Sequence, residues 1–229
     1  EFFSNVKTLV TDYSTFRAFR ITLTITIARE LCGCLAVLHF ASLIFSKAGY
    51  DGLTANQQAA VLGVVQLVGS CTASSLVERT GRKILLGTTC LVSGLSLGAL
   101  GVWFCVGSGT AAWLPVLCLC LCIYCDAAGL QPVPFVVMTE MFPFQLRGTV
   151  TSLVIAFACA LVSIELRVFQ PIAASVGLYV VFFIFSGVCL VSTVYIACCV
   201  PETKMKSIEQ IYAKLARKKT EDCEACTKL

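Results

Sequence analysis

Six long apolar stretches set the strongest limit on what this chain can fold into. About 20 apolar residues in a helix cross the roughly 30 Å hydrocarbon core of a bilayer. Inside lipid a single helix satisfies all its own backbone hydrogen bonds, whereas an isolated strand cannot. The pattern predicts an all-α, polytopic membrane protein. We expect six transmembrane helices within 21–200, at about 21–45, 59–77, 84–106, 113–139, 149–169 and 176–200, with a cytoplasmic linker end at 1–20 and a cytoplasmic tail at 201–229.

Composition supports a membrane protein and argues against a nucleic-acid-binding one. The 229 residues are 58% hydrophobic and 13% charged, whereas an ordinary soluble domain is about one quarter charged. The net charge is +4, but the basic residues sit beside apolar runs and form no basic surface of their own. We therefore expect the lipid bilayer and a small-molecule solute as partners, and no nucleic acid.

The basic residues also predict the orientation of the chain. If six spans cross the membrane, both ends lie on one side, and 14 of the 17 lysines and arginines fall on that side. Only Lys47 falls in a loop on the other side. Because cytoplasmic loops carry an excess of Lys and Arg, we expect both termini in the cytoplasm.

The 15 cysteines do not suggest a metal site or a disulfide framework. Thirteen of them lie inside apolar segments, where cysteine behaves as a small hydrophobic residue. The tail holds a single CxxC pair, Cys223 and Cys226, which is too little for a zinc site. The sequence thus predicts neither metal nor cofactor. Four cysteines crowd one segment without histidine or carboxylate at ligand spacing: Cys118, Cys120, Cys122 and Cys125.

Two prolines interrupt the fourth apolar stretch just before it ends. Pro132 and Pro134 each remove a backbone donor from the helix. Freed carbonyls in a membrane are tolerated only where protein or a water-filled cavity satisfies them, so the break predicts a cavity wall and a gating position. Glu140 and Arg147 then flank the turn at which the helix leaves the bilayer. We interpret that pair as a latch between loops.

Three motifs carry a resemblance to a known family. The segment 132–148, PVPFVVMTEMFPFQLRG, is similar to the pattern GPxPWxxxxEIFPxxxRG of sugar porters in the major facilitator superfamily. ERTGRK at 78–83 resembles the (D/E)RxGRR loop of that family, and VPETK at 200–204 resembles its PETKG exit. Their order and spacing match the carboxy-terminal half of such a transporter. The nearest type is the insect trehalose/hexose facilitator, from which this chain diverges.

The resemblance implies a function and a missing partner. It implies transport of a small polar solute by alternating access, facilitative or proton-coupled, in the plasma membrane and without enzymatic activity. It also implies an amino-terminal six-helix half upstream. Charges at the cytoplasmic helix ends, which could otherwise be ordinary solvated loop residues, would form a network that closes the cytoplasmic side: Glu78, Arg79, Arg82, Glu140, Arg147 and Glu202.

The chain departs from the family where sugar would bind. The glutamine pair of the motif QQLSGxNxxxYY is replaced by Arg29 and Glu30, and its tyrosines by His39 and Phe40. Ionisable residues at bilayer depth are functional candidates by default, although Arg29, Glu30 and Asp126 could instead form a structural charge cluster, and His39 could simply line the cavity. The candidate substrate-cavity residues are Arg29, Glu30, His39, Gln66, Asp126 and Phe135, the last standing where the family has tryptophan.

Two other classes of function stay open at the sequence level. A non-transporting sensor derived from a sugar porter would explain why the charge network is kept while the sugar contacts are lost. A membrane enzyme is the weaker alternative, because the sequence shows no nucleophile, paired catalytic acid or metal set at cavity depth.

Overall fold

The computed structural model describes residues 2–47, 54–106 and 113–204, together with 206, 208–210, 212 and 213. Residues 48–53, within the loop expected between the first two spans, residues 107–112, which form the loop expected between the third and fourth spans, and most of the predicted tail lie outside the described residues. The described part of the chain contains helices and no strand. In chain order the elements are α1 (Phe2–Thr11), α2 (Tyr13–Leu31), α3 (Cys34–His39), α4 (Ala41–Lys47), α5 (Ala55–Thr80), α6 (Arg82–Val106), α7 (Trp113–Cys125), the π-helical turn η1 (Asp126–Leu130), α8 (Pro132–Met141), α9 (Phe144–Ser175) and α10 (Leu178–Cys199).

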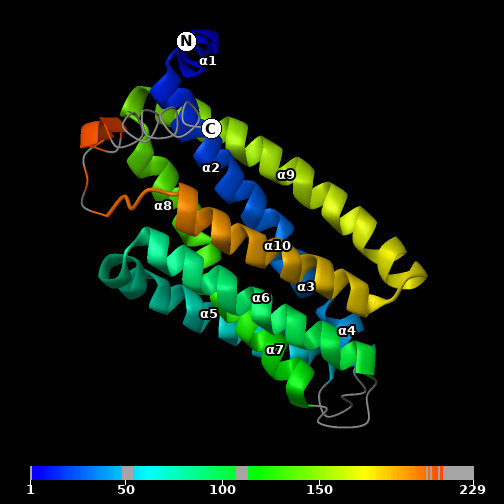
Figure 1. Ribbon diagram of the computed structural model, residues 1–229. Helices are drawn as coiled ribbons and strands as arrows, with labels where there is room; N and C mark the ends of the chain where they lie inside the picture. Colours follow the sequence, from blue (N-terminus) through cyan, green and yellow to red (C-terminus); the bar gives the residue numbers. More distant parts are fainter. Residues whose placement is uncertain are drawn as a thin grey trace, which may run out of the picture.

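Six of these helical units are long and apolar enough to cross a membrane. They are α2 with α3, α5, α6, the broken α7–η1–α8 unit, α9 and α10. Figure 1 shows them as one bundle, with α1, the start of α2 and the turn between α8 and α9 at the same end. The all-α fold with six membrane helices that the apolar stretches predicted is confirmed.

The first span begins earlier than the apolar stretch at 21–45 suggests. Asp12 caps α2, because its carboxylate accepts a hydrogen bond from the backbone N–H of Thr15 at 3.2 Å. Such a cap satisfies one of the free amides of a helix start. Much of the predicted linker is therefore helical. The same span is interrupted at Gly33, whose φ of 76° ends α2.

The break in the fourth span takes the form of a wider turn. In η1 the N–H of Gln131 donates to the carbonyl of Asp126 at 2.8 Å, five residues earlier. Single π-helical turns within α-helices occur often at functional sites. Pro132 then occupies the first turn of α8, where the missing N–H is tolerated.

Small residues let α6 and α10 pack closely along their length. A Cβ added at Gly94 would lie 2.8 Å from Cβ of Cys189, and one at Gly98 would lie 2.9 Å from Oγ of Ser186. Ser186 also donates from its hydroxyl to the carbonyl of Gly94 at 2.7 Å. Gly94 and Gly98 form a GxxxG pair, whose spacing permits such approaches between membrane helices. The two helices run side by side in Figure 1.

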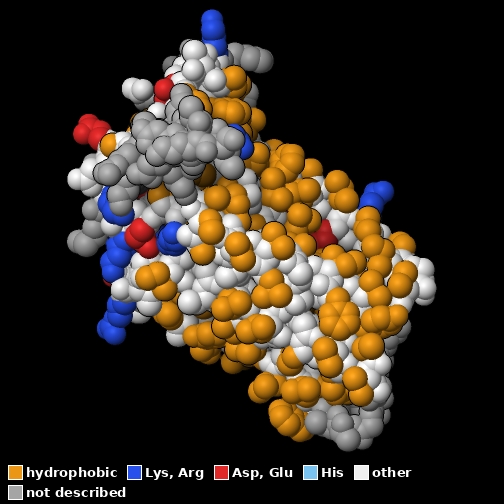
Figure 2. All heavy atoms as spheres, viewed as in Figure 1, with side chains coloured by type: hydrophobic (Ala, Val, Ile, Leu, Met, Phe, Trp, Pro, Cys, Tyr) orange, Lys and Arg blue, Asp and Glu red, His pale blue; other side chains and the backbone are white. Residues whose placement is uncertain are grey.

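The outer surface is apolar over most of its area. Figure 2 shows hydrophobic side chains covering the face of α6, α9 and α10, while most charged side chains gather toward the end near α1. Large side chains more than half exposed include Val64, Leu95, Ile164 and Val191. Exposed apolar surface of this extent marks contact with lipid or with another protein.

Candidate transport cavity and charged exit

A cavity of about 620 Å³ lies between α5 and the broken α7–η1–α8 unit. Pro132 and Phe135 line it from the predicted break, and Gln131 adds an amide beside them. Two serines of α5, Ser70 and Ser74, line the facing wall. The cavity extends to the charged helix ends, because Glu78 and Arg82 also line it. Its walls are thus partly polar.

A second, smaller cavity holds other predicted candidates. Its volume is about 430 Å³, and its walls include His39 from α3 together with Gln58 and Gln66 from α5. The His39 ring nitrogen Nδ1 lies 2.9 Å from the carbonyl of Leu35. The structure therefore separates the sequence candidates: Phe135 lines the first cavity, and His39 and Gln66 line the second.

Arg29 and Glu30 form an ion pair at the end of α2. Their side chains are 11% and 3% exposed, so the pair is largely removed from solvent. Glu30 directs one carboxylate oxygen to the guanidinium, while its Oε2 has no hydrogen-bond partner among the described residues. Since α2 ends at Leu31, this pair stands directly before the helix break at Gly33.

Two further acids lie within electrostatic range of this pair. Asp126, the first residue of η1, is buried and interacts with the charges of Arg29 and Glu30. Glu165 on α9 interacts with the same two charges. It is 9% exposed, and neither of its carboxylate oxygens has a hydrogen-bond partner among the described residues. The cluster thus gathers three carboxyl groups around one guanidinium.

At the charged exit, three segments far apart in sequence meet. Nη2 of Arg82 lies 2.7 Å from Oε1 of Glu140, and Nε of Arg82 donates to the same oxygen at 3.1 Å. The other oxygen of Glu140 accepts a hydrogen bond from the hydroxyl of Thr203 at 2.6 Å. The two charged side chains are 16% and 25% exposed, so water partly screens the pair. The junction ties together the start of α6, the end of α8 and the segment after α10.

Glu202 caps the start of α6. Its carboxylate accepts hydrogen bonds from the backbone N–H groups of Arg82 at 3.1 Å and Lys83 at 3.2 Å. A helix start presents free amides and a partial positive charge, both of which favour a carboxylate. Gly81 allows this approach: its φ is 91°, and a Cβ there would lie 2.9 Å from a Glu202 oxygen.

The remaining network candidates lie around this junction. Glu78 and Arg79 are exposed at the end of α5, and the carbonyl of Arg79 accepts from Nζ of Lys204 at 2.8 Å. Arg147 donates from Nη2 to the carbonyl of Phe142 at 3.3 Å, while its Nε has no partner among the described residues. Glu140 therefore pairs with Arg82, and Arg147 holds the backbone of the exit turn.

Several residues of these sites are absent from the sequence candidates, among them Gln131, Glu165 and Thr203. Gln131 directly precedes Pro132, so its place at the break was a usable signal. Glu165 is an acid inside an apolar stretch, which is also a signal, because such residues are rare in membrane helices. Thr203 is different. Nothing in its local sequence indicates that its hydroxyl bonds to Glu140, a contact that only the packed helix ends create.

The six long apolar helices define a multi-pass membrane protein. The sequence profile of the family described as sugar (and other) transporter matches residues 2–215. The chain belongs to this family.

Individual relatives agree with the family assignment. The chain is 31% identical over 203 residues to a protein of Bombyx mori named facilitated trehalose transporter Tret1, a match that covers 86% of this chain and 40% of that protein. It is 31% identical over 200 residues to a facilitated trehalose transporter Tret1-2 homolog of Drosophila simulans, with 85% and 41% covered. The chain thus spans about two fifths of the length of these relatives.

Solved structures show the same fold. A crystal structure of a D-xylose-proton symporter superposes with a TM-score of 0.77 at 21% identity, covering 89% of this chain and 48% of that protein. A double tryptophan mutant of XylE gives a TM-score of 0.75 at 23% identity, covering 86% and 42%. The chain therefore has the fold of about half of a major facilitator superfamily transporter.

Proposed function

We propose that this chain forms one half of a transporter that moves a small polar solute across a membrane by alternating access. One observation carries the proposal: Arg82 both lines the 620 Å³ cavity and pairs with Glu140 at its exit. Because Arg82 belongs to both the cavity wall and the closing contact, a change in one alters the other. Opening the exit would separate this pair and change the cavity wall.

The strength of the exit junction suits a gate. Partly exposed ion pairs contribute about 0–1 kcal/mol each, so the junction biases an equilibrium between closed and open states without locking it. The carboxylate of Glu140 also keeps Thr203 in place, and Glu202 keeps the segment after α10 against the start of α6. We propose that these contacts close the cytoplasmic side and separate together.

We further propose that the charged exit faces the cytoplasm, with both termini on that side, and that the protein acts in the plasma membrane. The distribution of lysines and arginines supports this orientation. The missing amino-terminal half would supply the opposite wall of the pathway, because transporters of this superfamily bind substrate between two six-helix halves.

The solute is proposed to be charged or poor in hydroxyl groups. The relatives are named trehalose transporters, but Arg29 and Glu30 stand where the family resemblance implies sugar-binding glutamines. Three carboxyl groups share one guanidinium, so the cluster can hold a proton or a further cation, which supports a positively charged solute or a co-transported ion. Glucose and trehalose are expected to be poor substrates, because each unpaired buried polar group costs about 1–3 kcal/mol.

A non-transporting sensor is the second candidate, favoured by the loss of the glutamine pair beside a complete exit junction. Uptake by the full-length protein in liposomes distinguishes the two. We expect saturable uptake of a small organic cation such as tetramethylammonium, and weak uptake of glucose and trehalose. Glu140→Ala should slow the cation uptake, while Glu209→Gln, on the exposed tail, should not. Absence of flux for every tested solute, with normal membrane insertion, would favour the sensor; saturable high-affinity glucose uptake would refute the proposed solute class.

A further inference from the structure

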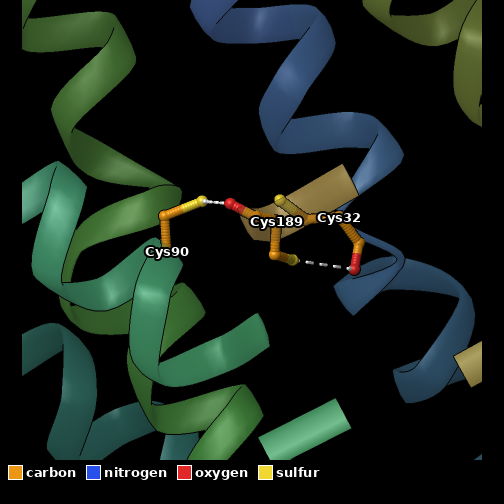
Figure 3. A group of neighbouring side chains, drawn as sticks. All are labelled: Cys32, Cys90 and Cys189. Carbon is orange, nitrogen blue, oxygen red and sulfur yellow. Dashed lines mark hydrogen bonds between the residues drawn. The ribbon is translucent and has the colours of Figure 1, made fainter. Parts of the chain in front are cut away.

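Three buried thiols from three different helices meet inside the bundle. Cys32 directly follows α2, Cys90 lies on α6 and Cys189 lies on α10. Their sulfur atoms all lie within 4.8 Å of one another. Figure 3 shows the side chains of Cys32 and Cys90 reaching toward each other on either side of Cys189. Among the described residues, no other histidine, cysteine or carboxylate joins this thiol triad.

Helix packing places the triad. The close approach of α6 and α10 at Gly94 brings the backbone of Cys189 against α6, one turn from Cys90. The left-handed conformation of Gly33 ends α2 immediately after Cys32. Each of the three residues is fully buried, with 0% exposure. The positions of the sulfurs are thus set by the backbones of three helices, which is how a preformed metal site is built.

The hydrogen bonds of the thiols are few and replaceable. Cys90 donates from Sγ to the carbonyl of Cys189 at 3.2 Å, and Cys189 donates to the carbonyl of Cys32 at 3.9 Å. The Cys189 carbonyl also accepts from the hydroxyl of Thr193 at 2.8 Å. It would therefore keep a partner if Cys90 lost its proton. Loss of the thiol proton is the step that metal binding requires.

We propose that Cys32, Cys90 and Cys189 bind one soft monovalent metal ion, Cu(I), inside the membrane bundle. Thiolate sulfur selects soft ions such as Cu(I) and Zn(II). Structural zinc is almost always four-coordinate, whereas the triad offers three ligands and no solvent-accessible fourth position. Because the thiolate is the form that binds metal, coordination by all three sulfurs releases three thiol protons and leaves the Cu(I) site with two negative charges. The ion would join α2, α6 and α10.

Because the triad is buried, the ion can enter only before the bundle is fully packed. The packed triad is closed to solvent, and Cys189 belongs to the last of the six spans. The site is therefore completed only when α10 packs against α2 and α6. We propose that the ion binds while the bundle assembles, so copper must be present during synthesis.

A second group of thiols supplies a matched control. Cys34 and Cys122 lie 3.5 Å apart, sulfur to sulfur, and both contact the hydroxyl of Ser93. Cys122 is as buried as Cys90, with 0% exposure. This pair offers two sulfurs instead of three. Cys122→Ser therefore tests whether loss of any buried thiol has the same effect.

The test measures metal in the full-length protein produced in copper-supplemented cells and purified under reducing conditions with a Cu(I) chelator. We expect one copper per protein in the wild type and in Cys122→Ser, and at least a tenfold loss in Cys90→Ser and in Cys189→Ser. X-ray absorption on the wild type should show three sulfur neighbours. Size-exclusion profiles and helical circular dichroism identify variants that fail to fold.

Several results would overturn the proposal. Equal copper in Cys90→Ser and the wild type, loss of copper in Cys122→Ser alone, zinc in place of copper, or no bound metal would each do so. If neither triad variant folds, X-ray absorption on the wild type decides, and a nitrogen or oxygen shell is then the contrary outcome. None of these readouts depends on solute transport, so the result is separate from the proposed function.

Discussion

Individual charged residues serve two different purposes in this protein. At the exit, Arg82 and Glu140 are partly exposed and hydrogen-bonded to each other, which gives a contact that can form and break. In the interior, Glu165 is buried and both its oxygens lack partners among the described residues. The first arrangement suits a gate. The second is a site where a bound cation or proton would be stabilised.

Loosening the exit junction should open the cavity toward the cytoplasm. Glu140→Gln removes the ion pair with Arg82, and Arg147→Ala removes the contact that holds the carbonyl of Phe142. A cysteine placed at Ser74, which lines the cavity, should then react up to about fivefold faster with a charged thiol reagent applied from the cytoplasm, because a weak pair is worth about 1 kcal/mol at most. Mass spectrometry of the labelled peptide measures the rate. Unchanged labelling in both variants would contradict the role of the junction.

Neutralising Glu165 should stabilise the fold while weakening cation uptake. Glu165→Gln removes a buried charge whose oxygens have no hydrogen-bond partner among the described residues, and a buried charge costs more than the neutral amide that replaces it. The purified full-length variant should melt at a higher temperature than the wild type, with slower uptake of the organic cation. Glu209→Gln, at an exposed position, serves as the control and should change neither value. A lower melting temperature for Glu165→Gln would show that the carboxylate has a stabilising partner.

At the level of the elements, irregular helices shape the site. The π-helical turn η1 precedes Pro132 and widens the fourth span where Gln131 and Phe135 line the cavity. The break at Gly33 follows the ion pair of Arg29 and Glu30. Regular helices such as α6 and α10 instead provide a rigid support, packed through small residues.

The α6–α10 contact should be sensitive to a single added methyl group. Gly94→Ala places a Cβ 2.8 Å from the Cβ of Cys189, and overpacking of this kind costs about 1–3 kcal/mol. Gly187→Ala on α10 is the matched control, because nothing lies within 4 Å of its new Cβ. Thermal unfolding in detergent should show a lower melting temperature for Gly94→Ala only. Equal melting temperatures for both variants would mean that α6 can shift to accommodate the methyl group.

At the scale of the whole molecule, the chain matches about half of a major facilitator superfamily fold. It covers 40% of the Bombyx mori relative and 48% of the D-xylose-proton symporter structure, and in both the match spans most of this chain. We propose that a second six-helix half covers the partly polar wall of the cavity. That expectation has two consequences that can be measured.

The 229 residues alone should not transport. Alternating access requires one six-helix half to move against the other, and without the second half the partly polar wall of the cavity would face lipid, which cannot satisfy its polar groups. Reconstituted in liposomes, the isolated chain should self-associate or unfold and give no solute-specific flux, unlike a chain extended by its native upstream sequence. Specific flux from a demonstrated monomer of the short chain would refute the two-half argument.

The orientation can be tested in intact cells. Epitope tags at Lys7 and in the tail at 201–229 should be accessible only after permeabilisation, and tags at positions 51 and 108 should be accessible from outside. Antibody binding to the tail of unpermeabilised cells would reverse the assignment.

The apolar stretches alone determined the class of fold, because lipid leaves a chain of this length and hydrophobicity few structures other than a helical bundle. The three motifs located the charged exit and the helix break, since local sequence controls helix ends. The sequence could not show which charges pair. Glu140 meets Arg82 and Thr203 across 58 and 63 positions only because three helix ends converge.

Convergence of helices also explains why the sequence did not predict the thiol triad. Their spacing along the chain indicated isolated hydrophobic residues and no metal site, while the packing of α2, α6 and α10 brings three sulfurs within 4.8 Å. Each membrane helix satisfies its own backbone hydrogen bonds, so the length and polarity of a span can be predicted from its own sequence. Contacts between helices depend on how close small residues such as Gly94 allow the backbones to come. The distance between helix backbones, and therefore each site formed between helices, is determined by the tertiary structure.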